Sequence, residues 1–150
     1  MNEIDHKIIG ILSTDARRSL AEIGGAVGLS PSSVNERIRR LTASGAIRRF
    51  TIEADPEAVG LATLVFIWVG LREDADEAGF RRHIAGDARV LECHHVTGAW
   101  SYLVKLRVGA PAEIEGFLAE LKATRYLGRS ETVIALSSPV AGAFVRRSDR

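Results

Sequence analysis

The chain has 150 residues, of which 46% are apolar and 26% charged, and its net charge is +1, so it is an ordinary globular protein of one or two domains without a strong overall field. Its longest apolar run, Leu61–Leu71, is too short for a membrane-spanning helix. Its single cysteine, Cys93, excludes an internal disulfide, and its N-terminus is unlike a signal peptide, so we predict a cytoplasmic protein. Lys and Arg outnumber Asp and Glu by eight to five in residues 1–52, whereas residues 53–150 carry twelve against fourteen, so the two parts are expected to have different partners.

The N-terminal third begins with two predicted helices. Apolar residues recur at helical spacing from Ile4 to Thr14, which predicts an amphipathic helix. A second helix is predicted over residues 19–27. Ser19 is suited to cap it, and Glu22, three residues later, would complete a capping box.

A short turn separates the second helix from a third. Gly28 can adopt the left-handed conformation that ends a helix, Ser30 can cap the next one, and Pro31 suits its first position. The third helix is expected to reach about Ser44 and to end at Gly45. Two helices joined by a short turn that contains glycine predict a helix-turn-helix in residues 1–52.

The third helix has two contrasting faces. On a helical wheel Val34, Ile38 and Leu41 form a narrow apolar face, and the opposite arc carries hydroxyl groups, one acid and arginines. These groups can read base edges in a major groove, although a solvated amphipathic helix would show a similar mix of charges. The turn and the basic bias favour DNA binding. The predicted contacts are Ser30, Ser32, Ser33, Glu36, Arg37, Arg39, Arg40, Arg48 and Arg49, with Arg37, Arg48 and Arg49 on the phosphate backbone.

Residues 46–60 connect this domain to the rest of the chain. Residues 46–52 alternate in polarity, which predicts a short strand, or wing, that carries Arg48 and Arg49. Residues 53–60 are polar and contain Pro56, and we interpret them as a linker.

Residues 61–138 predict a second domain. The strand at 61–71 is apolar on both faces, so we expect helices of the same domain to cover one face and another subunit the other. The later pattern predicts a helix at 73–86, strands at 89–96 and 100–108, a helix at 110–123 and a strand at 130–136. This β-α-β-β-α-β order predicts an α+β, ferredoxin-like module. Residues 139–150 are expected to form a tail whose end is disordered.

The residue pattern gives little support to catalysis or metal binding. Cys93, His94 and His95 invite a metal hypothesis, but only Cys93 and His95 would share a face of a strand, and two ligands do not close a site. The chain has no phosphate-binding loop, dinucleotide fingerprint or Ser-His-Asp order. We therefore predict no enzyme activity, no metal and no cofactor.

Four stretches together resemble the Lrp/AsnC family, also called feast/famine regulators. They are IDHKIIGILSTDARRSLAEIGGAVGLSPSSVNERIRRLTASGAIRRFTI, DPEAVGL, VTGAWSYLVKL and GRSETVIALS, and the likeness spans about residues 2–139. The resemblance implies a transcriptional regulator that binds double-stranded, pseudo-palindromic DNA. It also implies a homodimer, formed through the C-terminal module, which assembles into tetramers or octamers and responds to amino acids.

The resemblance also implies a site for the effector. The family typically shows Gly-x-aromatic-Asp-aromatic before a strand, and the matching residues here are Gly98, Ala99, Trp100, Ser101 and Tyr102. Ser101 takes the place of the family's acid, which removes a carboxylate that could pair with the ammonium group of a ligand. Either the ligand differs or the loop has become mainly structural.

Three other interpretations remain. The chain could be a regulator of this fold that needs no effector, or a sensing module that no longer binds DNA. Some haem-pathway decarboxylases also resemble this family in fold, and His94, His95 and Arg107 could then serve an enzyme. The intact, arginine-bearing third helix argues against that interpretation.

Overall fold

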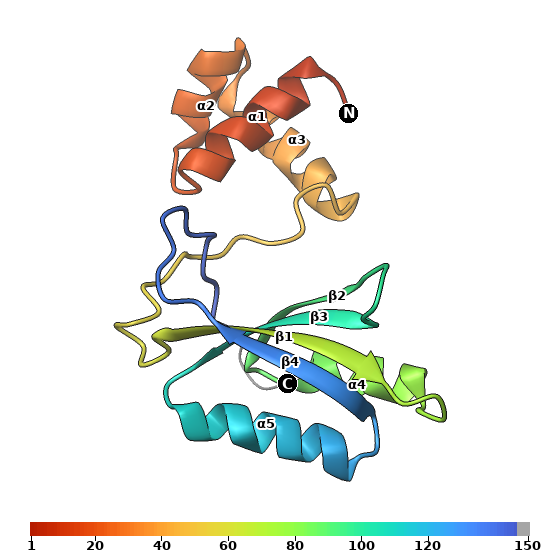
Figure 1. The fold of residues 1–150 in the computed structure, drawn as a ribbon. Coiled ribbons are helices and arrows are strands. Elements are labelled where there is room, and N and C mark those ends of the chain that lie inside the picture. The colour runs from red at the N-terminus through yellow and green to blue at the C-terminus, as the bar shows by residue number, and fades with distance from the viewer. Residues whose placement is uncertain (147–150) are drawn as a thin grey trace. The chain divides into compact units, whose positions relative to one another are not determined.

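A computed structural model describes residues 1–146, which form two compact units divided between Ile52 and Glu53. No helix within the described residues is both long and apolar enough to cross a membrane. The predicted combination of a helix-turn-helix and an α+β sheet module is confirmed, apart from the wing (Figure 1).

The first unit contains three helices whose ends follow local capping rules. Helix α1 (Glu3–Thr14) is capped by Asn2, α2 (Leu20–Val27) by Ser19, and α3 (Pro31–Ala43) by Ser30. The backbone N–H of Glu22 donates to Ser19 Oγ at 3.2 Å, and the Ser19 N–H donates to the Glu22 carboxylate at 3.0 Å. The predicted capping box is therefore confirmed.

A close turn and a small apolar core hold α2 against α3. Gly28 has a φ of 70°, the left-handed conformation expected at the end of a helix. The Leu29 N–H donates to the Gly24 carbonyl at 3.0 Å, so the turn folds back directly onto α2. The core consists of Ile8, Ile23, Val34 and Leu41, each no more than 6% exposed.

The predicted wing is wrong. Residues 46–52 form no strand, although Gly45 ends the third helix with a φ of 77° as expected. A strand needs a neighbouring strand to pair its backbone groups, and no described segment pairs with this one. Ile47 packs against the core of the first unit, but the later apolar side chains are open to solvent, with Phe50 51% and Ile52 79% exposed.

The second unit is a four-stranded antiparallel sheet with two helices. Its strands are β1 (Thr63–Leu71), β2 (Val90–His95), β3 (Tyr102–Val108) and β4 (Leu127–Ile134), in the spatial order β2-β3-β1-β4. The central strand β1 pairs with β3 and β4, and Ile67 lies opposite Val104 and Thr132. This arrangement matches the predicted β-α-β-β-α-β order.

Helices α4 (Glu77–Gly86) and α5 (Pro111–Ala123) cover one face of this sheet (Figure 1). The core between them and the sheet includes Val65, Ile67, Val69, Phe80, Val104, Leu106, Phe117 and Leu121, all at most 3% exposed. Helix α4 starts later than the predicted residue 73. The carboxylate of Asp76 accepts from the Gly79 N–H at 2.9 Å and fixes the start there.

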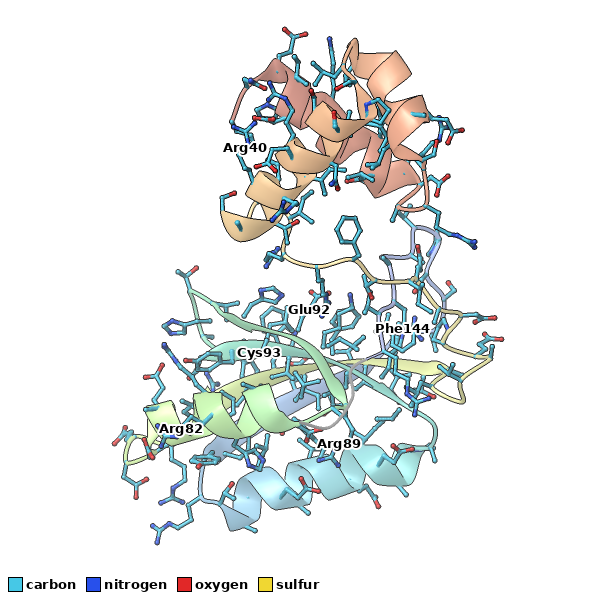
Figure 2. The ribbon with its side chains drawn as sticks, turned by 180° about the vertical axis from the view of Figure 1, so that it is seen from behind. Arg40, Arg82, Arg89, Glu92, Cys93 and Phe144 are labelled. Atoms are coloured by element: carbon cyan, nitrogen blue, oxygen red, sulfur yellow. The ribbon has the colours of Figure 1, made fainter. Side chains whose placement is uncertain are left out.

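The opposite face of the sheet is only partly covered. Leu64, Phe66 and Trp68 of β1 alternate with the buried residues and are half-buried on this face. The tail folds back over part of it, and Phe144, labelled in Figure 2, is 3% exposed. The Arg107 guanidinium lies over its ring, with Cζ 5.6 Å from the ring centroid. The Phe144 carbonyl also accepts from the Ala54 N–H at 2.9 Å. The disorder predicted for the end of the tail concerns residues 147–150, which lie outside the described residues.

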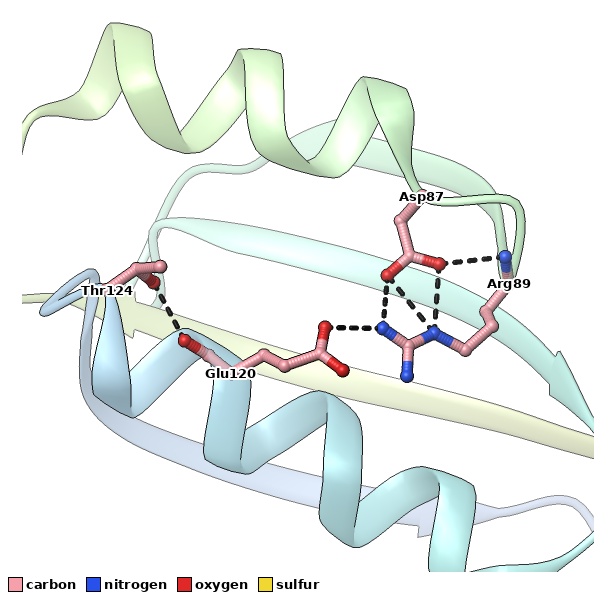
Figure 3. Close-up of polar contacts among 4 residues, drawn as sticks. All are labelled: Asp87, Arg89, Glu120 and Thr124. Carbon is pink, nitrogen blue, oxygen red and sulfur yellow. Dashed lines mark hydrogen bonds and ion pairs between the residues drawn. The ribbon is translucent and has the colours of Figure 1, made fainter. Parts of the chain in front are cut away.

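Arg89 connects the end of α4 to α5 through two ion pairs. Arg89 donates to Asp87, just after α4, and to Glu120 of α5 at 2.6 Å, as Figure 3 shows. Burial alone would raise the pKa of Asp87, but the hydrogen bonds from Arg89 lower that pKa below its ordinary value. The guanidinium also lies 5.3 Å from the ring centroid of Phe117, so it joins the edge of the core to both helices.

Candidate DNA-binding face and effector loop

Helix α3 presents the polar face that the sequence predicts. Val34 and Leu41 are buried and Ile38 is partly buried, and the opposite arc is exposed to solvent. The exposed residues of this arc are Ser32, Ser33, Glu36, Arg39, Arg40 and Ala43. Arg40 lies on the surface near the C-terminal end of α3 (Figure 2).

The serine residues at the start of α3 have different roles. Ser30 Oγ accepts from the Ser33 N–H at 3.2 Å and contacts the hydroxyls of Ser32 and Ser33 at 3.0 and 2.9 Å. Ser30 is therefore committed to capping the helix. Ser32 and Ser33 remain exposed at the helix N-terminus, where backbone N–H groups attract anions.

The three arginines of α3 and Arg48, which follows it, differ in how strongly contacts within the protein hold their guanidinium groups. Arg37 donates to Asp5 of α1 at 2.8 Å, and its side chain is only 20% exposed. Arg39 forms a long contact of 3.6 Å with Glu36, and both side chains are largely exposed, so this pair can separate at little cost. Arg40 and Arg48 are exposed. The phosphate contact predicted for Arg37 stays a prediction, but Asp5 competes for this guanidinium.

The segment after α3 adds two exposed cations. Arg48 and Arg49 belong to the irregular stretch before the second unit, and neither side chain forms an ion pair with a described residue. Their charges are thus available to a phosphate backbone without breaking an internal contact. Because residues 46–52 form no strand, Arg48 and Arg49 do not lie on the predicted wing.

In the second unit, Ser101 joins the β2–β3 loop to the end of β1. The Ser101 N–H donates to the Val69 carbonyl at 2.8 Å, and the Ser101 carbonyl accepts from the Val96 N–H at 3.1 Å. The Ser101 hydroxyl accepts from the Leu71 N–H at 3.1 Å. Serine thus has a structural role at the position where the family shows an acid.

Arg129 of β4 reaches the same loop from the other side of β1. It donates to the Ala99 carbonyl, and its Cζ lies 4.4 Å from the ring centroid of Trp100. Gly70, its register partner on β1, makes this crossing possible, because a Cβ at Gly70 would lie 2.8 Å from Arg129 Cγ. Gly98 has a φ of 100°, which a residue with a side chain rarely adopts.

Tyr102 ends the loop on the side of the sheet that faces the helices. Its hydroxyl donates to Glu77 and accepts from Arg81, both at 2.6 Å. Burial, together with the bond to Glu77, raises the pKa of Tyr102 above its ordinary value. The rings of His95 and Tyr102 stack with their centroids 4.9 Å apart.

A groove of about 430 Å³ runs between α4 and β2, beside Tyr102. Its lining includes Arg81, Cys93 and His95, and burial raises the pKa of the Cys93 thiol to about 11. His94 lies on the other face of the strand and contacts the Glu92 carboxylate at 3.1 Å. No group of three or more His, Cys, Asp and Glu side chains able to hold a metal ion occurs within residues 1–146.

Sequence reasoning missed the residues that approach the loop from distant strands. Arg129 and Gly70 meet the loop only through the pairing of β1 with β4, and Glu77 and Arg81 only through the packing of α4. A glycine inside an otherwise apolar strand was the available signal, because it marks a close approach.

Comparison with known proteins identifies both units. An AsnC-type helix-turn-helix domain model matches residues 1–42, and a model of the Lrp/AsnC ligand binding domain matches residues 64–143. The chain belongs to the Lrp/AsnC family. It is a transcriptional regulator that contains a helix-turn-helix DNA-binding unit and a ligand-binding unit.

Individual Lrp/AsnC proteins are similar to this chain along nearly its full length. The transcriptional regulator FL11 of Pyrococcus horikoshii is 34% identical over 138 residues, which cover 92% of this chain and 91% of FL11. The structure of Bacillus subtilis LrpC has a TM-score of 0.80 at 29% identity and covers 91% of this chain and 95% of LrpC. The structure of the Neisseria meningitidis regulator NMB0573, solved as a complex with L-Met, has a TM-score of 0.86 at 24% identity. The match covers 95% of this chain and 94% of NMB0573, and it supports the fold.

Proposed function

We propose that this Lrp/AsnC regulator binds a pseudo-palindromic operator through the exposed face of α3. Ser32, Ser33, Glu36, Arg39 and Arg40 would face base edges or phosphates, and Arg37, Arg48 and Arg49 would contact the phosphate backbone. The observation that carries this proposal is the exposed arc of α3 opposite Val34 and Leu41. Arginine can contact guanine with two hydrogen bonds, and a hydroxyl can contact either a base or a phosphate.

The binding form would be a cytoplasmic homodimer or a larger assembly of dimers. Two copies of α3 would enter successive major grooves about one helical turn apart, or a multiple of it. The half-buried apolar row of Leu64, Phe66 and Trp68 on the face away from the helices supports association of subunits through this face. Sedimentation at several protein concentrations would distinguish dimers, tetramers and octamers from a monomer.

The proposed effector site is the loop from Gly98 to Tyr102. An amino acid or a related small molecule bound there would shift the assembly, which requires that it prefer one assembly over another. Within residues 1–146 the backbone carbonyl and amide of Gly98 form no hydrogen bond, and these groups and the Trp100 ring support a site of this kind. The close internal bonding of Ser101 favours the alternative, a regulator that needs no effector.

We do not propose an enzyme activity. The helix-turn-helix unit retains its exposed arginines, and the relatives described above are transcriptional regulators. Of the histidines that a haem-pathway activity could use, His94 contacts Glu92 and His95 stacks on Tyr102. Absorbance of the purified protein near a haem band would overturn this part of the proposal.

Selection of bound fragments from genomic DNA, followed by binding titrations on the selected duplex, tests the central proposal. Arg39→Ala and Arg40→Ala should each weaken binding, and a residue that reads a base should also relax the preference at one operator position, by about 1–3 kcal/mol. Lys7→Ala, on the exposed side of α1, is the matched control for loss of one positive charge. Equal effects of all three substitutions would contradict the assignment of α3 as the recognition helix.

A further inference from the structure

The Arg129 guanidinium brings a positive charge to a loop that has no charged residue of its own. Residues 96–101 contain no Asp, Glu, Lys or Arg. Arg129 reaches them across Gly70, where an added Cβ would lie 3.1 Å from its Nε. Within residues 1–146 Arg129 forms no ion pair; its described contacts are the Ala99 carbonyl and the Trp100 ring.

Most hydrogen-bonding capacity of this guanidinium is unused. Among the described residues only Ala99 accepts a hydrogen bond from it, through Nη2. The guanidinium lies over the Trp100 ring, with Cζ 4.4 Å from the ring centroid, so the ring and the Ala99 carbonyl both hold it beside the loop. The planar fork of N–H donors of an arginine matches the two oxygens of a carboxylate.

The same loop offers no carboxylate to an ammonium group, and several of its other polar groups are already paired. The Ser101 amide and carbonyl are both paired, and its hydroxyl already accepts from Leu71. The Ala99 carbonyl accepts from Arg129. Glu131, two residues further along β4, lies on the same face of the sheet as Arg129, but its register partner is Trp68, whereas Arg129 extends across Gly70 towards the loop. An ammonium group held beside Arg129 would therefore meet a like charge, and the loop itself supplies no acid to pair with it.

We propose that the effector of this chain is a carboxylate without a positively charged amino group, such as a 2-oxo acid, and that Arg129 binds its carboxylate. The proposal rests on the effector role of the Gly98–Tyr102 loop given above. The apolar part of the ligand would pack on the Trp100 ring. An α-amino acid with the same side chain binds more weakly, because its ammonium group adds repulsion from Arg129.

Calorimetry on the full chain with matched ligand pairs tests this proposal. The pairs are 4-methyl-2-oxopentanoate with L-leucine, and phenylpyruvate with L-phenylalanine. We expect the 2-oxo acid of at least one pair to bind about tenfold or more tightly than its amino acid. Loss of a charge-assisted contact in Arg129→Gln should weaken 2-oxo acid binding by about tenfold or more. Arg129→Lys should restore part of it, because it keeps the charge without the fork.

Three further variants separate charge, position and folding. Gly70→Ala keeps every charge but displaces Arg129, so it should also weaken 2-oxo acid binding. Glu115→Gln changes a charge on α5, on the other face of the sheet, and should leave that binding unchanged. Ser101→Asp restores an acid beside the loop and should move the preference towards the amino acid. Circular dichroism and DNA binding of each variant report whether it is folded.

The outcomes distinguish this inference from the proposed function beneath it. An amino acid that binds the wild-type chain more tightly than its 2-oxo acid would overturn the inference while leaving the effector role of the loop intact. The inference also fails if Arg129→Gln and Gly70→Ala both keep wild-type affinity for the 2-oxo acid. No binding of either ligand class to the wild-type chain or to Ser101→Asp overturns both the inference and the effector role.

Discussion

Replacing Gly24 with alanine would place a methyl group against the backbone of the turn between α2 and α3. The added Cβ would lie under 3.0 Å from the Leu29 carbonyl oxygen, 3.5 Å from its carbonyl carbon and 3.7 Å from the Pro31 nitrogen. These are backbone atoms of a turn held by the hydrogen bond from the Leu29 N–H to the Gly24 carbonyl. The turn must therefore move, and the packing of α2 against α3 must move with it.

The expected magnitude is the difference between two opposing effects. Alanine is favoured over glycine inside a helix by about 0.5–1 kcal/mol, whereas forcing a methyl group into a filled space costs about 1–3 kcal/mol. Gly24→Ala should therefore lower the free energy of unfolding of residues 1–52 by about 1–2 kcal/mol. The neighbouring Gly25 has open space around its Cβ position, so Gly25→Ala should raise the same free energy by about 0.5–1 kcal/mol.

The assay must report on the first unit alone. Both tryptophans, Trp68 and Trp100, lie in the second unit, so their fluorescence does not follow the unfolding of residues 1–52. Hydrogen exchange of peptides from residues 1–52, measured over a urea series, gives the required free energy. If Gly24→Ala is as stable as Gly25→Ala by this measure, the close approach of the turn to α2 is wrong.

Three other predictions concern charge and packing. The Arg48→Ala, Arg49→Ala double variant should reduce the salt slope of DNA binding by roughly two, and an unchanged slope would remove both residues from the interface. Arg89→Met should destabilise the second unit by about 1–2 kcal/mol at pH 7 in urea titrations. The pKa of Asp87 in the folded protein lies below its ordinary 3.8, so the stability difference between the wild type and Arg89→Met should be present above pH 3.8 and shrink as the pH falls through the folded pKa. A stability difference that stays constant with pH would contradict the ion pair. Phe144→Ala should cost about 1.5–3 kcal/mol in unfolding followed by tryptophan fluorescence, and a cost under about 0.5 kcal/mol would show that the tail adds little.

Local signals explain why much of the first unit could be predicted from the sequence. A capping residue acts on backbone groups two or three positions away, so Ser19, Glu22 and Ser30 define helix ends without help from the rest of the chain. The burial of Val34 and Leu41 follows from helical periodicity alone. The start of α4 was misjudged because residues 73–76 are uniformly polar or small, and only the bond to the Asp76 carboxylate selects the first turn.

Features that depend on distant partners could not be predicted in this way. The alternation of residues 46–52 is typical of a strand, but a strand forms only where another backbone pairs with it. The approach of Arg129 to Trp100 requires the register between β1 and β4, which are separated by more than fifty residues of sequence. A shift of this register by one residue would turn Arg129 to the other face of the sheet.

The environment of Cys93 has a practical consequence for site-specific labelling. A rise in its pKa from the ordinary 9.0 to about 11 lowers the reactive thiolate fraction at neutral pH by about a hundredfold. A second cysteine introduced at an exposed position outside the proposed DNA-binding face, such as Ser13→Cys on α1, would react first with a maleimide dye. The wild-type chain can therefore serve as the background for a fluorescent probe of operator binding without removal of its native cysteine.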